Sequence, residues 1–261
     1  MRQGVWTTMP MRPDRPREQR VPPSAQLPPL SQFFARRFAT HSPFWSWILF
    51  ERLGGVLAYV FARLGIRPAA VTILGGISGI AGATVLGTAA DPLAVAVAAV
   101  LLLTAYTLDC ADGQLARATR TSSARGAWLD VTTDAVVLSF VAASLAVALL
   151  GNGGTPLQSL LISGAFGASR AASLLTATQV RAEEGGIPLT GAAGRLRRVY
   201  TAAIDTPFVY VLLCASRLYP MLFRAVIILI TLLSVIKMIV SARYHFMGMP
   251  RPHGRVPRQE E

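Results

Sequence analysis

Four aspartates form two closely spaced pairs between residues 109 and 134 of the chain. Asp109 and Asp112 are three residues apart, and Asp130 and Asp134 are four residues apart. On a helix, both spacings place the two side chains of a pair on one face. The flanking sequence is apolar, and carboxylates that converge in apolar surroundings repel one another unless a cation neutralises them. The two pairs therefore predict a cation site.

The ligands that this site offers are all oxygen atoms, because no histidine or cysteine lies nearby at a metal-ligand spacing. Oxygen ligands favour hard ions such as Mg²⁺ or Mn²⁺ over Zn²⁺. Four carboxylates can hold two such ions, an arrangement that stabilises phosphoryl oxygens during an in-line displacement. We therefore expect two divalent metal ions and phosphoryl-transfer chemistry.

Small residues and one arginine stand among these aspartates. Gly113 and Ala116 leave space on the helix of the first pair for a nucleotide base or a diphosphate. Arg117 has a forked guanidinium that suits a diphosphate. Gly126 allows the next helix to begin close beside the previous one. Each glycine alone would indicate only a turn or a packing position.

The elements that carry these residues are predicted to be membrane helices. Of the 261 residues, 52% are hydrophobic and only 15% are charged, and the mean hydropathy is +0.47, a composition typical of membrane proteins. Apolar stretches approach the roughly 20 residues that cross a bilayer as a helix. We expect an all-α integral membrane protein with six transmembrane helices, at about 68–88, 92–115, 126–150, 156–178, 199–217 and 220–242.

The segment before the first span mixes aromatic residues with arginines over residues 31–66, a pattern typical of an interfacial amphipathic helix. The alternative is a spanning helix over residues 43–64, which would bury Glu51 and Arg52 at a cost of several kcal/mol. The predicted organisation is a disordered basic arm (1–30), an interfacial juxtamembrane helix (31–66), a six-helix membrane domain (67–245) and a basic C-terminal tail (246–261).

The net charge of +12 indicates where the chain lies in the membrane. Most basic residues fall on one side of the predicted spans, which places both termini and the aspartates in the cytoplasm. Anionic lipid headgroups are the expected partners rather than nucleic acid, since the charges flank apolar spans. Cys110 and Cys214 fall near opposite faces, so no disulfide joins them. The excess of arginine over lysine favours a GC-rich bacterial genome, and hence the bacterial plasma membrane.

The segment from Asp109 to Asp134 reads D-x2-D-G-x2-A-R-x8-G-x3-D-x3-D. It resembles the signature of the CDP-alcohol phosphotransferase (CDP-alcohol phosphatidyltransferase) family at all eight fixed positions. The resemblance implies a homodimer that uses two metal ions. It implies metal ligation by Asp109, Asp112, Asp130 and Asp134, a catalytic base at Asp134, and contacts with cytidine diphosphate at Asp112, Gly113, Ala116, Arg117 and Gly126.

Basic residues near the same face form a second, weaker pattern. Arg170, Arg197, Arg198 and Lys237 would line a cytoplasmic cavity in the predicted topology, where they suit an acceptor that carries phosphate. We take Arg170, Arg198 and Lys237 as candidate acceptor-binding residues. The alternative is that such side chains reach out to lipid headgroups. Asp205 is expected to pair with one of these cations.

The resemblance implies transfer of a phosphatidyl group from CDP-diacylglycerol to a small polar alcohol, with release of CMP. The alcohol is plain or phosphorylated, as in glycerol 3-phosphate or an inositol phosphate. A second hypothesis reverses the roles, so that a CDP-linked headgroup passes to a lipid or polyol alcohol. A third is a cation-coupled transporter, although transporters carry their charges near the middle of the membrane, often in two repeated halves.

Overall fold

The computed structural model describes residues 46–183 and 204–246, and this part of the chain is helical without any strand. The predicted basic arm, residues 31–45 of the predicted interfacial segment, Arg197, Arg198 and nearly all of the C-terminal tail lie outside the described residues. The elements are η1 (Ser46–Phe50), α2 (Glu51–Arg63), α3 (Pro68–Thr88), α4 (Pro92–Ala118), α5 (Ala124–Gly151), α6 (Pro156–Glu183), α8 (Thr206–Ser216) and α9 (Pro220–Phe246). The all-α prediction is confirmed.

Four of the described helices are long and apolar enough to cross a membrane: α3, α4, α5 and residues 220–240 of α9. The six predicted spans are therefore not confirmed. Helix α8 has 11 residues and is about 16 Å long, well short of a hydrocarbon core of about 30 Å. Helix α6 has sufficient length, but Gln158, four serines and Arg170 make its described part more polar than the other long helices.

Helix α2 lies within the segment predicted as interfacial. Its face of small residues, Gly54, Gly55, Ala58 and Ala62, is buried and packs against α4. Whether the opposite, exposed face lies at a membrane surface stays a prediction. Gln114 donates a hydrogen bond of 2.8 Å to the carbonyl oxygen of Glu51, which ties the start of α2 to the helix of the first aspartate pair.

Prolines and polar caps determine where the long helices begin. Pro68 and Pro92 occupy the first positions of α3 and α4, where a missing N–H costs nothing. Asp91 accepts a hydrogen bond from the Ala94 N–H at the start of α4. Ser123 does the same for the Gly126 N–H at the start of α5. These caps satisfy N–H groups that would otherwise have no partner within the helix.

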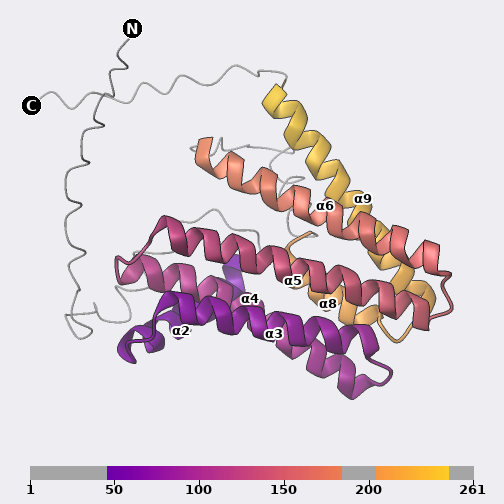
Figure 1. Cartoon of the computed structure of the whole chain (residues 1–261), viewed down its shortest axis with the longest axis horizontal. Coiled ribbons are helices and arrows are strands. Elements are labelled where there is room, and N and C mark those ends of the chain that lie inside the picture. Colours follow the sequence, from indigo (N-terminus) through magenta and orange to yellow (C-terminus); the bar gives the residue numbers. More distant parts are fainter. Residues whose placement is uncertain (1–45, 184–203, 247–261) are drawn as a thin grey trace, which may run out of the picture.

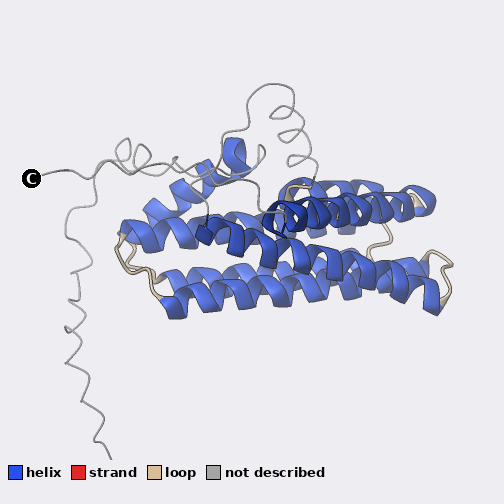
Figure 2. Ribbon diagram, turned by 90° about the horizontal axis from the view of Figure 1, so that it is seen from above, coloured by secondary structure: helices blue, strands red, loops and turns tan. Residues whose placement is uncertain are grey.

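Helix α3 packs extensively against both α4 and α5, whereas α4 and α5 hardly contact each other. Figure 1 shows the three helices running alongside one another, and Figure 2 shows that the described residues form helices joined by loops, without a strand. The two aspartate-bearing helices therefore do not pack directly on each other. Helix α3 keeps them apart, and the space that remains between them is where the aspartate side chains lie.

Glycines make this close packing around α3 achievable. A Cβ atom at Gly82 would lie 2.9 Å from the backbone nitrogen of Leu102 on α4, and one at Gly76 would lie 2.7 Å from Cγ2 of Thr133 on α5. On α6, Gly164 has no neighbour within 4 Å of such an atom, while Gly167 lies against Ala142 of α5.

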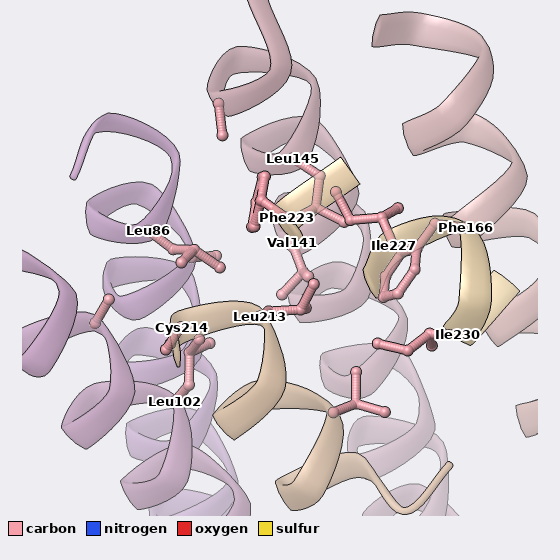
Figure 3. Packing of buried hydrophobic residues seen from close by; sticks show 14 of the residues in the cluster. Leu86, Leu102, Val141, Leu145, Phe166, Leu213, Cys214, Phe223, Ile227 and Ile230 are labelled. Atoms are coloured by element: carbon pink, nitrogen blue, oxygen red, sulfur yellow. The ribbon is translucent and has the colours of Figure 1, made fainter. Parts of the chain in front are cut away.

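The hydrophobic core joins α3, α4, α5, α6, α8 and α9. Figure 3 shows Leu86 of α3, Leu102 of α4, Val141 of α5, Leu213 of α8 and Ile227 of α9 converging. All five side chains are almost completely buried. The core therefore fixes the relative positions of the helices that supply the residues of the candidate site.

Arg217 holds the helices together at the end where α3 terminates. Only 7% exposed, it donates hydrogen bonds to the carbonyl oxygens of Leu86 (3.0 Å) and Gly87 (3.2 Å). A third goes to Oδ1 of Asn152, at 3.3 Å. Carbonyl groups in the last turn of a helix lack partners within the helix and carry partial negative charge. The guanidinium satisfies those of α3 and links it to the segment between α5 and α6.

We expect the Gly82→Ala variant to be less stable than the Gly164→Ala variant by about 1–3 kcal/mol. Both changes give the same gain in helix propensity, which therefore cancels. Only the first forces a methyl group against the backbone of Leu102. Thermal unfolding in detergent micelles measures the difference, and equal midpoints would contradict the close α3–α4 packing.

Candidate active site

The four aspartates of the two pairs line one pocket of about 120 Å³. Asp109 and Asp112 come from α4, and Asp130 and Asp134 come from α5. One carboxylate oxygen from each of Asp109, Asp112 and Asp130 lies within 4.8 Å of the others. The structure thus brings together the side chains that the sequence pattern predicted to converge.

Helices α3, α6 and α8 complete the walls of the pocket. Gly75 and Gly76 of α3 lie between the two aspartate-bearing helices, where any side chain would fill the space. Arg170 of α6 and Tyr210 of α8 line the same cavity. The absence of a Cβ atom on α3 is therefore required both for helix packing and for the volume of the pocket.

Asp112 and Asp130 differ in how their oxygens are satisfied. Asp112 is 4% exposed and accepts a hydrogen bond from the Thr72 hydroxyl of α3. The buried Oδ1 atom of Asp130 has no hydrogen-bond partner among the described residues. Because buried polar atoms normally have a partner, this oxygen has an unused capacity to bind a ligand.

A divalent cation fits this set of residues. Oxygens of three carboxylates lie close enough together to bind one ion. All the atoms that could bind it are oxygens, and one of them, Oδ1 of Asp130, is buried without a hydrogen-bond partner among the described residues. Mutual repulsion of the carboxylates, added to the cost of removing them from water, favours a bound positive charge. Such a site suits Mg²⁺ or Mn²⁺ by its ligand chemistry.

Of the residues predicted to contact cytidine diphosphate, Asp112 lines the pocket, whereas the other four lie on the helices that carry the aspartates but are not among the lining residues. A Cβ atom at Gly113 would lie 3.3 Å from Nη1 of Arg117, so the guanidinium lies along the surface that this glycine leaves open. Ala116 is half-buried beside them. Gly126 lies in the exposed first turn of α5, and an added Cβ atom there would meet only the Ser123 hydroxyl. Close approach of two helices does not explain this glycine.

The candidate acceptor-binding residues differ in where they lie relative to the pocket. Arg170 lines the pocket and donates hydrogen bonds of 2.8 Å to the Ile204 carbonyl and the Thr206 hydroxyl. Lys237 is half-buried on α9 and is not one of the lining residues. Arg198 lies outside the described residues.

Asp205 was expected to form an ion pair with one of the basic residues. Its hydrogen bonds come from the N–H and the hydroxyl of Ser46, while the guanidinium of Arg170 attracts its carboxylate electrostatically. The prediction overlooked Ser46 because this serine is 159 positions away in the sequence.

Several hydroxyl groups of the pocket were not predicted from the sequence. Tyr106 lies one helical turn before Asp109, and Thr133 directly precedes Asp134. Both residues are close to an aspartate of the motif in the sequence, and this spacing could have identified them as residues of the site. Thr72 and Tyr210 lie on helices remote in sequence, and only the fold reveals their position in the site.

A converging set of carboxylates on helices that are long and apolar enough to cross a membrane is consistent with a membrane enzyme that acts on phosphoryl groups. The model of the family described as CDP-alcohol phosphatidyltransferase matches residues 66–240, and the chain belongs to this family. It is therefore a transferase of phospholipid biosynthesis, and the predicted family and phosphatidyltransferase function are confirmed.

Solved structures with a similar fold include the phosphatidylinositol phosphate synthase PgsA1 of Mycobacterium tuberculosis. The crystal structure with CDP-DAG bound is 21% identical, with a TM-score of 0.50, and the match covers 80% of this chain and all of the other. The apo form is 22% identical with a TM-score of 0.49, over 72% of this chain and 93% of the other. At these identities the likeness concerns the fold alone. No curated protein sequence matched the chain.

We expect Asp130→Asn to weaken Mn²⁺ binding at least about tenfold and to abolish turnover. Loss of a partner outside the ligand shell already costs about 10- to 100-fold in affinity, so loss of a ligand costs no less. Titration of the detergent-solubilised protein with Mn²⁺ measures the affinity.

Asp91→Asn is the matched control, because Asp91 is an exposed aspartate that caps the opposite end of α4. It should bind Mn²⁺ like the wild type. Unchanged affinity in Asp130→Asn would contradict the metal site.

Proposed function

We propose that the protein transfers the phosphatidyl group of CDP-diacylglycerol to a small polar alcohol, with CMP as the leaving group. The observation that carries the proposal is the convergence of the four motif aspartates in one pocket. Membership of the family and the fold shared with a synthase whose structure holds CDP-DAG support the choice of donor.

Asp109, Asp112, Asp130 and Asp134 would hold two divalent ions, Mg²⁺ or Mn²⁺. Such ions stabilise negative charge on phosphoryl oxygens during displacement. Thr72 orients one oxygen of Asp112 through its hydroxyl, and the unpartnered oxygen of Asp130 is available as a further ligand.

Asp134 is the proposed general base. It lies one turn further along α5 than Asp130 and lines the same pocket. Its carboxylate would take the proton of the acceptor hydroxyl as that oxygen bonds to the phosphorus distal to cytidine. The bond from this phosphorus to the bridging oxygen breaks, and CMP leaves with the electron pair.

The nucleotide would lie against the exposed side of α4 and the start of α5. Gly113 and Ala116 offer little side-chain bulk there, and Arg117 presents a guanidinium beside Gly113. A forked, permanently charged donor suits a diphosphate. Asp112 and Gly126 complete the proposed contacts with cytidine diphosphate.

Arg170, Arg198 and Lys237 remain the proposed acceptor-binding residues. The position of Arg170 in the pocket wall supports it, whereas Lys237 has no such support. We further propose a homodimer in a bacterial plasma membrane, with the site and both termini on the cytoplasmic side, where CDP-activated lipids and water-soluble alcohols meet.

Release of CMP from CDP-diacylglycerol, measured with Mg²⁺ or Mn²⁺ and a panel of alcohols, tests the function. The panel includes glycerol 3-phosphate, an inositol phosphate and serine. A parallel reaction with a CDP-linked headgroup and a lipid alcohol tests the reversed assignment of substrates. If no combination releases CMP, the proposal fails and a cation-binding transport role gains support.

We expect Asp134→Asn to lower kcat at least about 10²-fold, the lower range for a positioned acid–base group. The amide keeps the size of the side chain and one oxygen, but it cannot take a proton. Affinity for Mn²⁺ and for a CDP-lipid analogue should survive. If metal affinity falls as far as in Asp130→Asn, Asp134 is primarily a ligand and another group is the base.

A further inference from the structure

Helix α3 brings a single hydroxyl group to the pocket of the aspartates. Of the described residues that line this pocket, three belong to α3: Thr72, Gly75 and Gly76. The two glycines follow Thr72 by three and four residues, so all three share one face of the helix. Thr72 is 7% exposed, and its hydroxyl is therefore largely withdrawn from water.

The Thr72 hydroxyl has one hydrogen to donate and two acceptors within reach. One acceptor is Oδ2 of Asp112 on α4. The other is the carbonyl oxygen of Pro68, one turn earlier in α3, at 3.2 Å. The contact with the carboxylate is the shorter of the two, and an ionised acceptor forms the stronger hydrogen bond. The hydrogen therefore goes to Asp112.

This hydrogen bond occupies one of the two oxygens of Asp112 and leaves the other for a bound ion. The donor and the acceptor belong to different helices, α3 and α4, which pack extensively against each other. The bond consequently fixes the orientation of a carboxylate that is only 4% exposed. Asp112 cannot turn both oxygens toward an ion without giving up its bond to Thr72.

The number of oxygens that a carboxylate offers affects which ion it binds. Ca²⁺ takes about six to eight oxygen ligands and often binds a carboxylate through both oxygens. Mg²⁺ is smaller and requires nearly octahedral surroundings, and Mn²⁺ suits the same kind of oxygen site. A carboxylate restricted to one oxygen therefore favours the two smaller ions.

We propose that Thr72 is a positioning residue that sets the ion selectivity of the aspartate cluster. By holding Oδ2 of Asp112, it favours Mg²⁺ or Mn²⁺ over Ca²⁺. The inference rests on the proposed function and adds the choice of ion to it. Thr72 acts on the ion through Asp112 and does not need to touch it.

Competition between Mn²⁺ and Ca²⁺ for the detergent-solubilised protein tests the proposal. The electron paramagnetic resonance signal of free Mn²⁺ is followed while Ca²⁺ is added. The measured quantity is the ratio of the two dissociation constants, which does not depend on how much of a variant folds. No substrate is present, so the ratio does not depend on turnover either.

Thr72→Val keeps the branched shape of the side chain but removes the hydroxyl. We expect its preference for Mn²⁺ over Ca²⁺ to fall at least about tenfold below that of the wild type, the lower range for loss of a residue that orients a metal ligand. Thr72→Ser keeps the hydroxyl, and its preference should stay within about threefold of the wild type, well inside that range.

Thr107→Val is the matched control. Thr107 is 8% exposed on α4, and its hydroxyl donates to the carbonyl oxygen of Leu103 in the same helix, at 2.7 Å. The change removes a buried threonine hydroxyl that does not orient an aspartate. This variant should therefore keep the wild-type preference between the two ions.

A wild-type preference in Thr72→Val would overturn the role of the Thr72 hydroxyl while leaving the proposed function intact. An equal fall in Thr72→Ser or in Thr107→Val would overturn it as well. Release of CMP decides the proposed function separately. If no alcohol releases CMP while the ion preference still depends on Thr72, the transferase proposal fails and the selectivity role stands. Absence of Mn²⁺ binding in the wild type would overturn the metal site and both proposals with it.

Discussion

Mutual repulsion among four carboxylates in an apolar helical bundle is the constraint on which the rest of this structure depends. Charges of one sign cannot share a dry pocket without a cation or a dense set of donors. The described chain supplies few donors, chiefly the Thr72 hydroxyl at Asp112, and leaves one buried oxygen of Asp130 without a partner. The protein alone thus satisfies the cluster incompletely. A bound divalent cation would supply the missing stabilisation, as the proposed chemistry requires.

Helix α3 sets the spacing between the two helices that carry the carboxylates. If α4 and α5 packed directly on each other, the carboxylates would be pressed together with no room for an ion or a substrate. Helix α3 separates them, and its glycines allow both helices to approach it closely. At its C-terminal end the buried guanidinium of Arg217 satisfies the last carbonyl groups of α3. One end of the bundle is therefore tightly closed, while the end with the short α4–α5 turn keeps a pocket.

The parts of the site that could be predicted from sequence are those determined by local spacing. The aspartate pairs were predictable because i,i+3 and i,i+4 positions share a helix face whatever the tertiary fold. The six predicted spans are not confirmed, because α8 has only 11 residues and the described part of α6 carries Arg170 and several serines. Contacts between residues far apart in the sequence could not be predicted either. The bond between Ser46 and Asp205 joins residues 159 positions apart, and no periodicity in either segment indicates the other.

The N-terminal helical segment helps to position the helices of the site, although the family match begins only at residue 66. Gln114, two residues beyond Asp112, donates to the carbonyl oxygen of Glu51, and Ser46 binds Asp205 at the start of α8. The segment therefore connects the helix of the first aspartate pair with the helix that supplies Tyr210. Residues that match the family hold the carboxylates, whereas Ser46, outside the match, orients a phenol beside them. Contacts from a segment outside the family match therefore help to hold the wall of the pocket that the matched residues form.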